Sequence, residues 1–178
     1  MKAIILASGS PRRSEILTHM GVAFEKQAAN VDEHCDLGAW EAVAELSRRK
    51  AQAVAAQFPG RVVLAADTLV ALENRPLGKP EDEEDACRML ERLSGREHQV
   101  YTGVCVVDAQ GRVMQAVDAS SVCFRAITED EIRAYVATGE PMDKAGAYGV
   151  QGQGALLVER IDGDFFNVMG LPVVLLSR

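Results

Sequence analysis

The sequence predicts an α/β domain with a mixed β-sheet and flanking helices. Two observations carry this prediction: strand-then-helix units stand near the N-terminus, and a long antiparallel hairpin is predicted over residues 98–126. The 178 residues are enough for one substantial core and short for two. Because no repeat, low-complexity tract or linker interrupts the chain, we expect a single domain over residues 1–178.

The N-terminal unit begins with a short apolar run. Residues 3–7 are typical of a buried strand, and a helix is predicted to follow them directly. Ser10 suits the N-cap of that helix, Pro11 its first turn and Gly21 its end.

A longer helix and a second buried strand come next. The helical pattern covers residues 39–58 and stops at Pro59. Residues 61–72, RVVLAADTLVAL, form a continuous apolar run that favours an interior strand. The predicted apolar face of the helix comprises Trp40, Ala44, Ala51, Ala55 and Phe58.

The middle of the chain predicts a helix followed by the hairpin. Pro80 opens the helix and Gly95 ends it. Residues 98–107 alternate as a strand does, residues 108–111 read as its turn, and residues 112–126 return antiparallel.

The last third predicts one capped helix, a glycine-rich loop and a second hairpin. Thr128 and Glu131 form a capping box, and Gly139 is predicted to stop the helix. The loop covers residues 144–154. After it, ALLVERI and DFFNVMG flank Asp162-Gly163, which favours a hairpin turn.

Composition excludes several classes of function. The net charge of −7 argues against a general nucleic-acid or membrane-surface binder, so we expect neither partner. The four cysteines form no CxxC pair and indicate buried side chains in a reducing compartment. The N-terminus has no secretory apolar region and no run is long enough to span a membrane, so we expect a cytoplasmic protein.

The stretch LASGSPRR at residues 6–13 indicates an anion site. A helix that starts after Ser-Gly-Ser offers free backbone N–H groups, hydroxyls and the positive end of a dipole. Arg12 and Arg13 lie in the first turn, where that dipole disfavours cations unless an anion binds. The stretch is not a P-loop, because GxxxxGK[ST] is absent.

Two charged residues interrupt apolar patterns. Asp67 lies inside the run 61–72, where burial is costly unless a cation or metal pairs with it; an exposed strand end is the alternative. Lys50 falls on a helical stripe with Val43, Leu46 and Val54, so it points either into a charged cleft or along the edge toward solvent.

Two loop residues complete the candidate set. Lys79, in Gly-Lys-Pro, is either a solvated lysine or a phosphate contact. Glu33, in NVDEH, is either a solvated carboxylate or a Mg²⁺ ligand, since that ion is held by one or two carboxylates and substrate phosphates. His19, His34 and His98 stand in unrelated contexts, which weakens a Ser-His-Asp reading. The inventory favours a metal-dependent enzyme that handles phosphates.

Six blocks, in order along the chain, resemble the Maf family of nucleotide pyrophosphatases. They are LASGSPRR, AADTLV, GKP, SGREHQVYTGV, EPMDKAGAYGVQG and IDGDFFNVMGLP. The resemblance implies an inosine-triphosphatase-like fold with two lobes around an active-site cleft, assembled as a homodimer. It also implies hydrolysis of a nucleoside triphosphate to monophosphate and pyrophosphate with Mg²⁺ or Mn²⁺.

The resemblance also implies roles for individual residues. Asp67 matches the catalytic base or metal ligand, and Glu33 the second acidic position. The positions that match phosphate contacts are Ser8, Arg13, Lys50 and Lys79. Those that match the specificity pattern of dTTP/UTP enzymes are Arg12, Thr68 and Gln151. A glutamine can offer both donor and acceptor to a pyrimidine edge.

Two departures from the family pattern and two alternative functions stay open. Ala66 stands where relatives often have glycine. The chain stops soon after GLP, where relatives usually continue into a further helix, so we expect PVVLLSR to begin that helix, and the predicted homodimer loses support if its contact uses that helix. A nucleotide-binding regulator of cell division and a 7-methyl-GTP pyrophosphatase are the alternatives to a dTTP/UTP pyrophosphatase.

Overall fold

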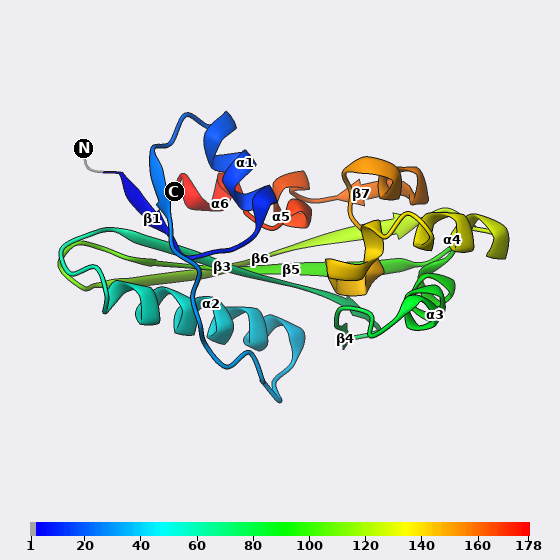
Figure 1. Cartoon of the computed structure of the whole chain (residues 1–178), viewed down its shortest axis with the longest axis horizontal. Coiled ribbons are helices and arrows are strands. Elements are labelled where there is room, and N and C mark those ends of the chain that lie inside the picture. The colour runs from blue at the N-terminus through cyan, green and yellow to red at the C-terminus, as the bar shows by residue number, and fades with distance from the viewer. Residues whose placement is uncertain (1–2) are drawn as a thin grey trace.

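A computed structural model describes residues 3–178 and shows one mixed β-sheet along the long axis of the molecule (Figure 1). Met1 and Lys2, part of the segment in which we expect no secretory signal, lie outside the described residues. The strands follow the order β2-β1-β3-β5-β6-β7, with β4 paired to β3. Their bounds are β1 Ile4–Leu6, β2 Phe24–Lys26, β3 Val63–Leu72, β4 Arg75–Leu77, β5 Glu97–Val107, β6 Val113–Phe124 and β7 Val158–Asp162.

The strand directions confirm the predicted mixed sheet. β1 runs parallel to both β2 and β3, whereas the other pairs are antiparallel. Parallel neighbours require a crossover, and the helices after β1 and β2 supply it. The predicted hairpin is confirmed, since β5 and β6 pair from Glu97↔Cys123 to Val107↔Val113.

Helices cover both faces of the sheet. α2 lies on one face, and α1, α5 and α6 lie on the other (Figure 1). α3 and α4 pack at the far end of the sheet, beside 3₁₀ turns at Glu140–Asp143, Ala145–Ala147 and Gly152–Leu157. The helix bounds are α1 Pro11–His19, α2 Ala39–Ala55, α3 Glu83–Leu93, α4 Glu129–Val136, α5 Phe165–Met169 and α6 Val173–Leu176.

The first half of β3 joins two apolar clusters through its alternating side chains. Val63 and Ala65 pack in the cluster that contains Ala51 and Val54 of α2. Leu64 and Ala66 pack in the cluster that contains Ile16 and Leu17 of α1, with Met169 of α5. The alternation therefore assigns successive β3 residues to opposite layers of helices.

Several local predictions are confirmed. α1 begins at Pro11 with Ser10 at the N-cap, and Gly21 follows the helix with a positive φ of 69°. Thr128 and Glu131 form the predicted capping box. Val63–Leu72, most of the predicted run 61–72, forms the interior strand β3 between β1 and β5.

The predicted hairpin at Asp162-Gly163 is wrong, because the segment after β7 is the helix α5. The Asp164 side chain accepts a hydrogen bond from the Phe166 amide at 2.8 Å and so caps a helix start. Gly170 ends that helix with a positive φ of 110°. These cap residues outweigh the turn propensity of Asp-Gly.

Two predicted helix features also differ from the structure. The third helix begins at Glu83 rather than at Pro80, because the Asp82 side chain caps the Asp85 amide at 2.7 Å. The predicted apolar face of α2 is wrong in part: Trp40 is 48% exposed, and the buried face carries Val43, Leu46 and Val54 instead. Strands β2 and β4, three residues each, had no prediction.

Among residues 3–178, none of the helices combines the length and apolar character that a membrane span requires.

Candidate active site

A cavity of about 670 Å³ opens between the two ends of the molecule. It is lined by the start of α1, by Lys50 of α2, by the middle of β3 and by residues between Asp143 and Val150, around the 3₁₀ turn Ala145–Ala147. The predicted residues that line it are Ser8, Arg12, Arg13, Glu33, Lys50, Asp67, Thr68 and Lys79. Gln151 is exposed and does not belong to the lining, although its neighbour Val150 does.

Lys50 joins two carboxylates in this cavity. Its Nζ lies 2.5 Å from Asp67 Oδ1 and 2.8 Å from Glu33 Oε1. Lys50 and Asp67 are largely buried, with side chains 12% and 11% exposed, whereas the Glu33 side chain is 62% exposed. Lys50 therefore points into a charged cleft, and Asp67 is a buried, paired carboxylate.

Strand alternation explains why these partners meet. Asp67 continues the β3 face of Val63 and Ala65, which packs on α2, and Lys50 projects from α2 toward it. Thr68 continues the opposite face, which packs on α1, and Arg13 projects from α1 toward it. Two successive strand residues thus meet a cation from each side of the sheet.

The two carboxyl groups have opposite pKa shifts. Burial raises the pKa of Asp67, although the charges of Lys50 and Arg13 oppose the rise. The hydrogen bond from Lys50 lowers the pKa of Glu33. Two neighbouring carboxyl groups whose environments shift their pKa values in opposite directions are a pairing that active sites use.

Arg13 is held by three hydrogen bonds from separate parts of the chain. Its Nε donates to the Gly170 carbonyl at 2.8 Å, and its two terminal nitrogens donate to Ser8 Oγ and Thr68 Oγ1, each at 3.1 Å. Burial lowers the pKa of the guanidinium, and the Asp67 carboxylate opposes this. The planar group is therefore fixed in orientation at the cavity wall.

The α1 start has the form of an anion-binding site. Ala7 to Arg13 all line the cavity, and Ser8 Oγ accepts a hydrogen bond from the Ser10 amide at 3.1 Å. Ser10 occupies the N-cap without a side-chain cap, so its hydroxyl does not occupy the first-turn amides. Lys79 adds an exposed cation, whose charge contributes to the low pKa of Glu33.

Behind Arg13 lies a buried polar chain that sequence analysis missed. Thr68 Oγ1 and Thr102 Oγ1 lie 2.9 Å apart, and Thr102 donates to the Asn167 carbonyl at 2.9 Å. Asn167 Nδ2 in turn donates to the Val100 carbonyl at 3.0 Å. The polar residues within apolar segments were the available signal, but their partners lie on elements far apart in sequence, β3, β5 and α5.

A second missed feature is a clamp on the loop that carries Gln151. Glu140 accepts hydrogen bonds from the Gln153 amide at 3.0 Å and the Gly154 amide at 3.1 Å. Tyr135 donates to Glu140 at 2.9 Å and accepts from the Gly149 amide at 3.3 Å. Both ends of the loop 149–154 are therefore tied to α4 and the turn after it.

Glu33 and Asp67 fit a metal ion whose remaining ligands come from the substrate rather than from the protein. Within residues 3–178, no cluster of three or more His, Cys, Asp or Glu side chains is placed to hold a metal ion. Glu33 and Asp67 nevertheless contact one shared cation, Lys50 Nζ, at the cavity. Two carboxylates at one cavity suit Mg²⁺, which is usually held by one or two carboxylates plus phosphates.

Fold and site together define a mixed α/β protein with a charged central cleft. A profile of the family described as Maf-like protein matches residues 3–178. The chain therefore belongs to the Maf-like protein family, as its sequence blocks predicted.

Individual relatives agree with this family. A dTTP/UTP pyrophosphatase of Moorella thermoacetica is 52% identical over 177 residues, which are 98% of this chain and 91% of that protein. One of a Geobacillus species is 49% identical over 97% of this chain and 94% of that protein. The solved Ham1 protein of Staphylococcus aureus is 16% identical, with a TM-score of 0.50 over 69% of this chain and 72% of that one. This last likeness confirms the inosine-triphosphatase-like fold.

Proposed function

We propose that this protein is a nucleoside triphosphate pyrophosphatase that prefers dTTP and UTP. It hydrolyses the α–β phosphoanhydride and releases nucleoside monophosphate and pyrophosphate. The observation that carries the proposal is Asp67, a buried carboxylate with a raised pKa that faces a cavity lined by Arg13, Lys50 and Lys79. Relatives with about half of their residues identical carry that activity in their names.

Some residues of the site bind the phosphates, and Asp67 accepts the proton of the attacking water. Arg13 and Lys79 bind phosphate oxygens, together with Ser8 and the free amides at the start of α1. Lys50 keeps Asp67 ionised in a buried position until the substrate arrives. Asp67 then orients the attacking water and accepts its proton, while the bond to the pyrophosphate oxygen breaks.

Glu33 and Asp67 are the residues that would hold a divalent cation, Mg²⁺ or Mn²⁺. Such an ion, when bound, neutralises charge on the phosphates. The protein's own contribution is the pairing of a rim carboxylate, Glu33, with a buried one, Asp67, on the same side of the cavity.

Base selection is assigned to Arg12, Thr68 and Gln151. Arg12 lines the cavity, and Gln151 stands beside the lining residue Val150 on a clamped loop. Thr68 Oγ1 is hydrogen bonded to Arg13, so this residue also links base selection to the phosphate site. A homodimer in the cytoplasm, with no nucleic acid or membrane partner, completes the proposal.

The test is a substrate panel with product identification. The purified protein is incubated with dTTP, UTP, the other common triphosphates and 7-methyl-GTP in Mg²⁺ or Mn²⁺, and products are separated by anion exchange. We expect monophosphate and pyrophosphate, formed fastest from dTTP and UTP. Release of orthophosphate and diphosphate would refute the cleavage position, and a preference for 7-methyl-GTP would refute the assignment of Arg12, Thr68 and Gln151.

A further inference from the structure

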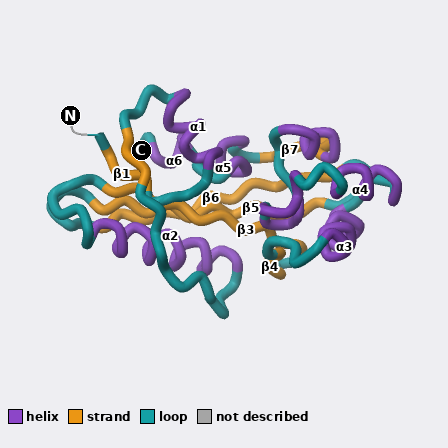
Figure 2. Tube along the Cα trace, viewed as in Figure 1, coloured by secondary structure: helices purple, strands orange, loops and turns teal. Residues whose placement is uncertain are grey.

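Glu33 lies on a segment with no regular structure of its own. The chain from β2 to α2 is a loop (Figure 2), and no backbone–backbone hydrogen bond joins residues 28–37 to any other part of residues 3–178. The side chain of Glu33 is 62% exposed, so packing does not fix it. Its place beside Lys50 must be set by side chains that bind the loop.

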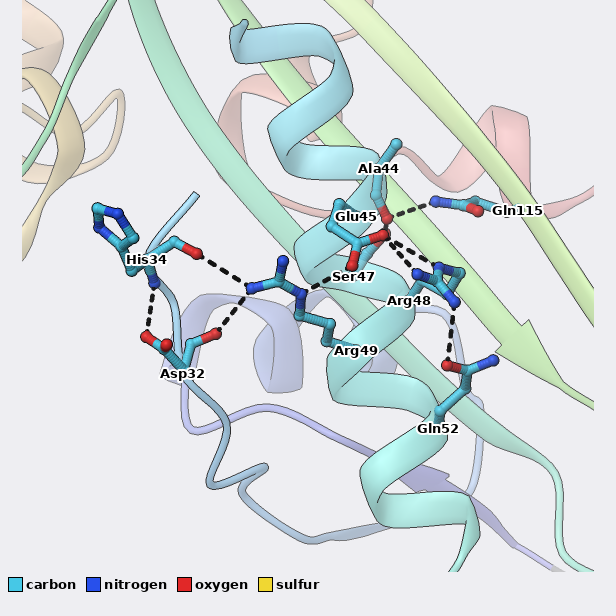
Figure 3. Close-up of polar contacts among 9 residues, drawn as sticks. All are labelled: Asp32, His34, Ala44, Glu45, Ser47, Arg48, Arg49, Gln52 and Gln115. Carbon is cyan, nitrogen blue, oxygen red and sulfur yellow. Dashed lines mark hydrogen bonds and ion pairs between the residues drawn. The ribbon is translucent and has the colours of Figure 1, made fainter. Parts of the chain in front are cut away.

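Arg49 binds the loop on both sides of Glu33. Its Nη1 donates to the Asp32 carbonyl at 3.3 Å and to the His34 carbonyl at 3.0 Å (Figure 3). These carbonyls belong to the residues immediately before and after Glu33. The next residue of α2, Lys50, binds the Glu33 carboxylate itself at 2.8 Å. Two successive helix residues therefore hold the backbone and the side chain of one acidic residue.

The guanidinium of Arg49 is itself oriented by a carboxylate one turn earlier in α2. Arg49 Nε donates to Glu45 Oε1 at 2.8 Å, which leaves Nη1 free to reach the loop (Figure 3). Arg48 binds the other oxygen of Glu45 at 2.6 Å and also Gln52, but it has no hydrogen bond to the loop. Arg48 and Arg49 thus share Glu45 as a partner, but Arg49 contacts the loop whereas Arg48 contacts Gln52 of its own helix.

We propose that Arg49 is a positioning residue that places Glu33 at the metal and phosphate site by binding the carbonyls on either side of it. The contacts of Arg49 with the loop do not depend on the proposed function, whereas the role of Glu33 as a metal ligand rests on it. A planar guanidinium can bind Glu45 through Nε and the loop through Nη1, two separated atoms, whereas a lysine would have to reach both from a single nitrogen. Removal of such outer partners of a metal ligand typically costs about 10- to 100-fold in metal affinity or activity.

The test compares Arg49→Met and Arg49→Lys with Arg48→Met. The Arg48 variant also loses an ion pair with Glu45. The first measurement is Mn²⁺ binding in the presence of α,β-methylene-dTTP. Binding is detected as a decrease in the EPR signal of free Mn²⁺. We expect both Arg49 variants to weaken binding about tenfold and Arg48→Met to match the wild type. The second is amide hydrogen exchange over residues 30–36, which we expect to quicken in the Arg49 variants alone.

A Glu33→Gln background distinguishes action through Glu33 from a general effect. In that background Arg49→Met should weaken Mn²⁺ binding no further, because the ligand it positions is already lost. Additive losses, equal losses in Arg48→Met and Arg49→Met, or unchanged exchange in the loop would each overturn the proposal. If the wild type releases no pyrophosphate, the proposed function fails, but the exchange comparison still decides whether Arg49 anchors the loop.

Discussion

Lys50 of α2 and Asp67 of β3 form an ion pair of 2.5 Å at the centre of the cavity, with both side chains largely buried. A buried pair of this kind gives little net stability, because desolvation of two charges offsets their attraction. It fixes where the carboxylate points, and the charge of Lys50 opposes the rise in the pKa of Asp67 that burial causes. The pair is therefore better explained by the chemistry of the site than by the stability of the fold.

Asp67→Asn is expected to stop pyrophosphate release while the fold stays intact. The amide has nearly the same shape but cannot accept a proton, so we expect kcat to fall by about 10²- to 10⁴-fold. Product formation from dTTP and thermal unfolding followed by circular dichroism check the two halves of this prediction. Glu159→Gln, at an exposed carboxylate on β7, is the matched control and should retain activity. A fully active Asp67→Asn enzyme would exclude this residue as the base.

Glu140→Gln is expected to weaken the recognition of the base and leave the chemical step nearly unchanged. It loses the charge that strengthens the hydrogen bonds to the Gln153 and Gly154 amides, so the loop with Gln151 becomes less ordered. We expect KM for dTTP to rise about five- to tenfold. Steady-state kinetics with dTTP and GTP measure KM for each. The ratio of kcat/KM for dTTP to that for GTP should fall.

The control for Glu140→Gln is Glu129→Gln, which removes an exposed ion pair with Arg133 on α4. This variant should keep the KM of the wild type, because its carboxylate does not contact the loop. A fall in kcat with unchanged KM in Glu140→Gln would show that the clamp serves the phosphate site instead.

The sequence predicted the elements whose signals are local. The run 61–72 is apolar at nearly every position, which favoured an interior strand over a half-exposed one. Helical periodicity put Lys50 on a stripe with Val43 and Val54, which left a charged cleft and the edge toward solvent as its two possible directions, and the structure shows the first. Such inferences succeed because the period of a helix or strand fixes the direction of each side chain.

The features that sequence analysis missed depend on pairing across the fold. Thr102 and Asn167 are joined by a hydrogen bond although 65 residues separate them, and neither has a local pattern that indicates the other. The same limit explains the error at Asp162-Gly163, where turn propensity was local and the competing cap at Asp164 was overlooked. The contact of Arg49 with the His34 carbonyl had no local signal either, because its partner lies on a loop without periodicity.

His98 is expected to make the fold less stable at acid pH. It is buried with Nε2 2.7 Å from the Tyr148 hydroxyl, and burial lowers its pKa to about 4. The unfolded chain binds a proton near pH 6.5 and the folded one only near 4, so the stabilisation is complete above 6.5 and is lost as the pH falls toward 4. A shift of this size corresponds to about 3 kcal/mol.

The measurement for His98 is urea unfolding of the wild type and of His98→Gln between pH 4 and pH 7. Tyr148, whose pKa burial raises, stays protonated throughout this range, so it adds no slope. The difference in the free energy of unfolding between the two proteins should shrink as the pH falls. A constant difference across this range would contradict a neutral buried imidazole.

Gly103→Ala is expected to reduce activity and stability together, because this glycine sets the distance between α2 and the sheet. Gly103 pairs with Asp67 in the β3–β5 register, and a Cβ there would overlap the carbonyl of Val43 in α2. The backbone of a helix cannot yield as a side-chain end can, so α2 must move away. We expect unfolding to cost about 1–3 kcal/mol less than in the wild type.

The same displacement carries Lys50 away from Asp67, so kcat should fall more than the loss of stability explains at temperatures well below Tm. Cys105→Ala is the matched control, because Cys105 packs against α2 two residues further along β5 and the change removes volume instead of adding it. It should lower Tm and leave kcat at the assay temperature unchanged. If Gly103→Ala behaves like Cys105→Ala, the close approach of α2 supports the core but does not set the geometry of the ion pair. A selective loss of kcat in Gly103→Ala would instead show that Gly103 lets α2 approach the sheet closely enough for Lys50 to contact Asp67.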